Sequence, residues 1–70
     1  MNKSIDNGVK LFELKKYHES LEIFQNLLKN DPRNIKVLMY TSFNLMFLKK
    51  FEDAIKILHQ VLKLKSNIAD

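Results

Sequence analysis

The sequence predicts an all-α protein of four helices, arranged as two antiparallel helix-turn-helix hairpins. Its apolar residues recur every three or four positions, which is typical of amphipathic helices. The 70 residues include one glycine and one proline, too few for sheets joined by tight turns. The chain also aligns with itself without a gap after a shift of 34 residues. We therefore expect a single domain over 1–70, with one repeat at about 1–34 and a second at about 35–68.

The repeat is clearest around one short segment of each unit. Leu14-Lys15-Lys16-Tyr17 aligns with Leu48-Lys49-Lys50-Phe51. Other positions agree in residue class or identity, among them Leu11 with Leu45, Ile23 with Ile57, Leu27 with Val61 and Leu28 with Leu62. A match that continues through most of both units indicates a duplicated structural element.

The expected helices are separated by recognisable breaks. Pro32 cannot continue a helix, and Asn34 can cap the helix that follows. The first helix is expected to end near Leu14, before a break at Lys15-Lys16, and the second to run to about Lys29. The third is expected at about Ile35–Leu48 and the fourth at about Glu52–Leu64. Helices of about 13 residues are marginal alone, so packing must stabilise them.

The spacing and the size pattern resemble the tetratricopeptide repeat (TPR). The residues that carry this resemblance are Gly8 and Ser42 at a small site, Tyr17 and Phe51 at the start of the second helix, Ser20 and Ala54 at its small site, Phe24 and Leu58 one turn later, and Asp31-Pro32 between repeats. The resemblance implies that the hairpins stack as a short right-handed α-solenoid.

This sequence departs from the family pattern at several positions. Ser4 and Leu38 occupy the usual tryptophan site, and Lys65-Ser66 replaces the terminal proline. Lys15 and Lys49 replace the glycine that is common in the turn within each repeat, so these turns need a less comfortable backbone.

The resemblance also implies a concave groove formed by the first helix of each hairpin, able to bind a peptide or a helix. The groove-facing positions are expected to be Asn2, Ile5, Val9, Phe12, Glu13, Lys36, Met39, Tyr40, Phe43, Met46 and Phe47, with Leu11, Leu14, Leu38, Leu45 and Leu48 in the core. The third helix is then apolar nearly all round, and such a helix is normally buried. Two interpretations remain open: an apolar groove for an amphipathic partner, or packing of these residues on neighbouring helices.

A second apolar surface is expected at the end of the second hairpin. Repeat arrays need a covered end for stability, and the sequence stops at Ile68-Ala69-Asp70, where another helix would begin. The residues expected to be partly uncovered are Leu45, Leu58, Val61, Leu62 and Leu64. We expect them to support self-association as a homo-oligomer, or to continue into a longer repeat array.

The residues give no sign of an enzyme or of a cofactor. His18 and His59 lie on different expected helices without an evident partner, cysteine is absent, and the only glycine is Gly8, so no metal site, thiol nucleophile or phosphate loop is expected. No stretch approaches the roughly 20 apolar residues of a membrane span, and we expect a cytoplasmic protein. The alternative function is nucleic-acid binding through lysines, although the net charge of +4 includes a single arginine, Arg33.

Overall fold

The computed structural model describes the backbone of residues 3–69 and the side chains of residues 4–66. This part of the chain contains four helices and no strand: α1 (Lys3–Glu13), α2 (Tyr17–Asn30), α3 (Ile35–Phe47) and α4 (Phe51–Ala69). The all-α prediction is confirmed. Asn2, expected in the groove, lies outside the described residues.

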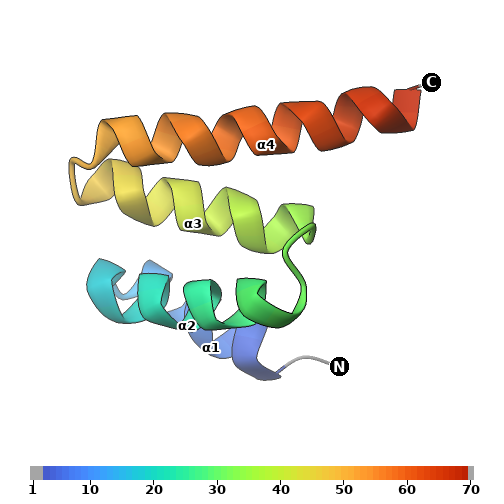
Figure 1. Ribbon diagram of the computed structural model, residues 1–70. Helices are drawn as coiled ribbons and strands as arrows, with labels where there is room; N and C mark the ends of the chain where they lie inside the picture. Colours follow the sequence, from blue (N-terminus) through green and yellow to red (C-terminus); the bar gives the residue numbers. More distant parts are fainter. Residues whose placement is uncertain (1–2, 70) are drawn as a thin grey trace.

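The helices pack in the order in which they follow along the chain. α1 contacts α2, α2 contacts α3 and α3 contacts α4, while α3 also reaches α1. Figure 1 shows α3 between α2 and α4, with α4 along one outer edge of the molecule. The apolar character of α3 therefore has a structural explanation, because it is the helix that touches all the others.

Most helix boundaries agree with the sequence, but the end of α4 does not. Its predicted end at Leu64 is wrong, because the helix continues to Ala69. The segment from Lys65 to Ala69 contains neither glycine nor proline, so nothing local stops the helix.

The turns within the two hairpins have the same backbone structure, 34 residues apart. Lys15 and Lys49 both adopt the left-handed conformation, with φ of 65° and 64°. In the first turn the Lys16 N–H donates to the Leu11 carbonyl over 2.8 Å, and the Lys50 N–H donates to Leu45 over the same distance. The less comfortable backbone predicted for these glycine-free turns is confirmed, since a side chain in this region costs about 1–2 kcal/mol.

The link between the hairpins is a short capped turn. The Asn34 carboxamide oxygen accepts a hydrogen bond from the Val37 N–H over 3.1 Å, so the predicted cap of α3 is confirmed. The Asn34 amide group also donates to the Asp31 carboxylate over 3.1 Å. Together these bonds fix the direction in which α3 leaves α2.

The core lies along α3, which packs against α2 on one side and α4 on the other. Its buried apolar residues are Leu21, Phe24, Val37, Leu38, Leu45, Ala54 and Val61. The predicted core positions Leu38 and Leu45 are confirmed, whereas Leu11 and Leu48 are half-buried. Leu14 was expected in the core, and this expectation is wrong. Its side chain is 60% exposed because α1 ends at Glu13 and the turn carries Leu14 away from the packing surface.

Candidate binding surface

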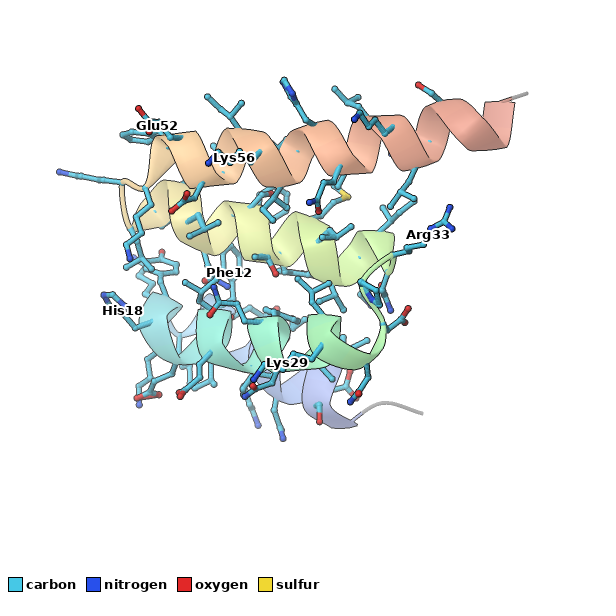
Figure 2. All side chains as sticks on the ribbon, in the orientation of Figure 1. Phe12, His18, Lys29, Arg33, Glu52 and Lys56 are labelled. Atoms are coloured by element: carbon cyan, nitrogen blue, oxygen red, sulfur yellow. The ribbon has the colours of Figure 1, made fainter. Side chains whose placement is uncertain are left out.

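Phe12 of α1 is the centre of an aromatic cluster that joins the first hairpin to α3. Its ring centroid lies 5.5 Å from Tyr40, 6.2 Å from Phe43 and 5.7 Å from Phe47, with edge-to-face or tilted rings. Tyr17, at the start of α2, stacks on Phe47 at 4.6 Å. Such ring pairs add about 0.5–1.5 kcal/mol each beyond their burial. Figure 2 shows Phe12 in the layer between the first hairpin and α3.

Phe24 of α2 extends the same contact deeper into the molecule. Its side chain is fully buried and its ring stacks on Tyr40 at 5.3 Å. The tip of the ring faces Gly8, where an added Cβ would come within 2.6 Å of the ring. Gly8 is thus required by close packing, and α1, α2 and α3 are held together around one phenylalanine.

A buried polar chain crosses the same three helices and was not predicted. The Ser20 hydroxyl donates to the Gly8 carbonyl over 2.8 Å and accepts from the Asn44 amide group over 2.9 Å. The Asn44 side chain is fully buried, and its carboxamide oxygen has no hydrogen-bond partner. A sequence signal was present, because Asn44 interrupts the apolar residues of the third helix.

The predicted concave groove is only partly a hydrophobic surface. Ile5, Val9 and Met39 are half-buried, and the four predicted aromatic or apolar residues Phe12, Tyr40, Phe43 and Phe47 are brought together in the cluster. The hollow between α1 and α3 has walls of mixed polar and apolar character, formed by Asp6, Asn7, Val9, Lys10, Glu13, Lys36 and Tyr40. The α1 side of the predicted groove therefore combines charged side chains with half-buried apolar ones, and Phe12, Tyr40 and Phe43 of its aromatic residues are half-buried in the cluster.

Two predicted groove residues, Met46 and Phe47, are exposed, at 44% and 57%. Further exposed apolar side chains lie along α4, where Phe51, Ile55 and Leu62 are 56%, 53% and 62% exposed. We call Met46, Phe51, Ile55 and Leu62 the open face. Phe51 also lines an apolar hollow of about 180 Å³ with Phe43, Met46 and Phe47. Because the α4 members recur at intervals of four and seven residues, they lie on one side of that helix.

The predicted self-association end is therefore composed differently from what was expected. Leu45 and Val61 were expected to be uncovered, and this is wrong: both are 5% exposed, because they lie in the contact between α3 and α4. Leu58 and Leu64 are half-buried, and Leu62 is exposed as expected. The prediction missed Phe51 and Ile55, and these could have been found from the repeat.

The repeat relates the open face to a surface that is covered in the first hairpin. A shift of 34 residues places Met46 on Phe12, Phe51 on Tyr17, Ile55 on Leu21 and Leu62 on Leu28. In the first hairpin these four counterparts are buried or half-buried; Phe12 and Tyr17 contact aromatic rings of α3, and Leu21 belongs to the core cluster with Leu45 of α3. The open face is thus the second copy of the surface that holds α3.

The opposite end of the molecule has a different character. On α3, Tyr40, Asn44 and Phe47 contact α2. Their counterparts on α1 are Asp6, Lys10 and Glu13, all of them exposed. α1 therefore has charged side chains at the positions where α3 has the side chains that contact α2. The outer surface of the first hairpin is polar at these positions.

The described residues contain no group of three or more metal-ligating side chains. His18 and His59 are both exposed, and Figure 2 shows His18 projecting at one edge of the molecule. Within residues 3–69 none of the helices has the length and apolar character that a membrane span requires. No protein-family model, no curated protein and no solved structure matches this chain.

Proposed function

We propose that this protein is a protein–protein interaction module that binds an apolar or amphipathic helix on its open face. The proposal rests on a comparison within the chain. The open face repeats, position by position, the surface on which the first hairpin holds α3. The resemblance to the TPR family supports the same function, with the two hairpins as successive repeats of a right-handed α-solenoid.

The open face offers enough apolar surface for a specific contact. Burying a large apolar side chain contributes about 1.5–3 kcal/mol, and Phe51, Ile55 and Leu62 are each more than half exposed. Met46 adds an adaptable side chain beside the hollow that Phe43 and Phe47 also line. We expect a partner helix with apolar residues at positions i, i+3 or i+4, and i+7, which is how helices bind in grooves.

A suitable probe comes from the chain itself. A fluorescent peptide with the sequence of residues 35–48 carries the side chains that the first hairpin recognises, and lysines at its outward positions would keep it in solution. We expect fluorescence anisotropy to show that this peptide binds the protein. The substitution Leu62→Glu should weaken that binding at least tenfold, because a carboxylate would be buried without a partner.

Leu14→Glu is the matched control. Leu14 and Leu62 are leucines of almost equal exposure, 60% and 62%, but Leu14 lies in the turn of the first hairpin. If both substitutions weaken binding equally, or if the folded protein does not bind the peptide, the proposed function is wrong. A salt titration tests the nucleic-acid alternative, since binding to phosphate falls steeply with salt and apolar binding does not.

A further inference from the structure

The two ends of the molecule do not match each other. If copies joined head to tail, the open face of one copy would be covered by the outer surface of α1 in the next. That surface carries exposed Asp6, Lys10 and Glu13 where α3 carries Tyr40, Asn44 and Phe47. Burying these charges against apolar side chains is costly, because none of the four residues of the open face could pair them. Head-to-tail stacking is therefore disfavoured.

The open face does match itself. We propose that a second copy of the chain covers it, with the two α4 helices packed antiparallel around a twofold axis to give a closed dimer. This inference rests on the surface assigned under the proposed function and names its partner. A twofold contact places the same patch on both sides, so an apolar patch meets an apolar patch. No such match is available for the head-to-tail arrangement.

The spacing of the apolar residues on α4 defines the register. A twofold axis near Leu58 and His59 places Ile55 of one copy against Leu62 of the other, and brings the two Leu58 side chains close to the axis. Phe51 then lies near the end of the partner helix. The contact is about one helix wide, so we place it at the small end of the range of specific interfaces and expect association that depends on concentration.

The charges along α4 favour the antiparallel orientation. Glu52 and Asp53 lie in the first turn, whereas Lys63 and Lys65 lie near the other end. All four are exposed, and Figure 2 shows Glu52 projecting outward at the start of α4. An antiparallel pair brings Glu52 of one copy near Lys63 of the other, and it also opposes the helix dipoles. A parallel pair would place acidic turns together and basic turns together.

The test is sedimentation velocity over a wide range of protein concentrations. We expect a monomer–dimer equilibrium without larger species. Leu62→Glu should give a monomer, and Leu14→Glu should dimerise like the original chain. Circular dichroism of both variants verifies that they remain helical. A chain that stays monomeric at the highest concentration overturns the proposal, and so does open-ended assembly beyond the dimer.

A charge exchange tests the orientation itself. Glu52→Lys should weaken the dimer severalfold, because it places two cations together, and adding Lys63→Glu should restore it. Failure of the double variant to recover overturns the antiparallel register. The same measurements separate this proposal from the proposed function. A chain that is monomeric but still binds the α3 peptide through Leu62 contradicts self-association and leaves the proposed function intact. A dimer that the peptide dissociates supports both, because the two ligands compete for one face.

Discussion

The two hairpins share a backbone pattern but differ in what covers their apolar sides. Their turns have the same left-handed lysine and the same hydrogen bonds. The first hairpin is closed by α3 on one side and is polar on the other, whereas the second leaves Phe51, Ile55 and Leu62 exposed. The shared turns therefore follow from the repeat, whereas the residues at a few outward positions determine whether each hairpin leaves an apolar side uncovered.

The largest expected difference between the hairpins is at the position shared by Phe24 and Leu58. Phe24→Ala should cost about 3–5 kcal/mol, because it leaves a cavity between Gly8 and Tyr40. That is most of the stability of a small domain, so we expect the variant to be largely unfolded. Leu58→Ala should cost about 1 kcal/mol, because Leu58 is only half-buried. Urea unfolding followed by circular dichroism measures the free energy of unfolding of both variants. Equal losses of stability would show that the two hairpins do not differ at this position.

A smaller effect is expected at the buried polar chain, in which Ser20 of the first hairpin joins Gly8 of α1 to Asn44 of α3. Ser20→Ala should cost about 1–3 kcal/mol, because the Gly8 carbonyl and the Asn44 amide group both lose their partner. The double variant Ser20→Ala with Asn44→Leu should be more stable than the single one, since the Asn44 amide group is then no longer buried without a partner. Thermal unfolding of the two variants side by side makes the measurement. If the double variant is the less stable, Asn44 contributes in some way other than through Ser20.

The smallest effect should be the same in both hairpins. Lys15→Gly and Lys49→Gly should each raise the free energy of unfolding by about 0.5–1 kcal/mol, because glycine enters the left-handed region without a steric penalty. Nearly identical φ values predict nearly identical gains. Lys16→Gly is the control and should stabilise less, since Lys16 has a negative φ of −94° and no left-handed strain to relieve. Unequal gains at the two turns would show that tertiary contacts, and not the local backbone, set their strain.

The sequence predicts the helices well because their determinants are local. Periodicity and the repeat locate four elements, Pro32 and Asn34 separate the hairpins, and the missing glycine reveals strained turns. The candidate surface was harder to predict, because α4 is apolar over about half of its circumference. Periodicity alone does not say which part of that arc faces α3, so Val61 was expected outside and Ile55 was missed. That choice depends on how α4 is rotated against α3, which is a property of the packed structure.

The order in which the helices contact each other also bears on how the chain folds. Almost every packed pair consists of neighbours along the sequence, and only the contact between α1 and α3 bypasses an element. Proteins rich in such local contacts fold within microseconds to milliseconds, because little loop entropy is lost before contacts form. We therefore expect rapid folding that can start in either hairpin and spread across the Asp31–Asn34 link. In stopped-flow or temperature-jump experiments, mutations that weaken the link should slow this spreading, while substitutions on the open face should leave the folding rate unchanged.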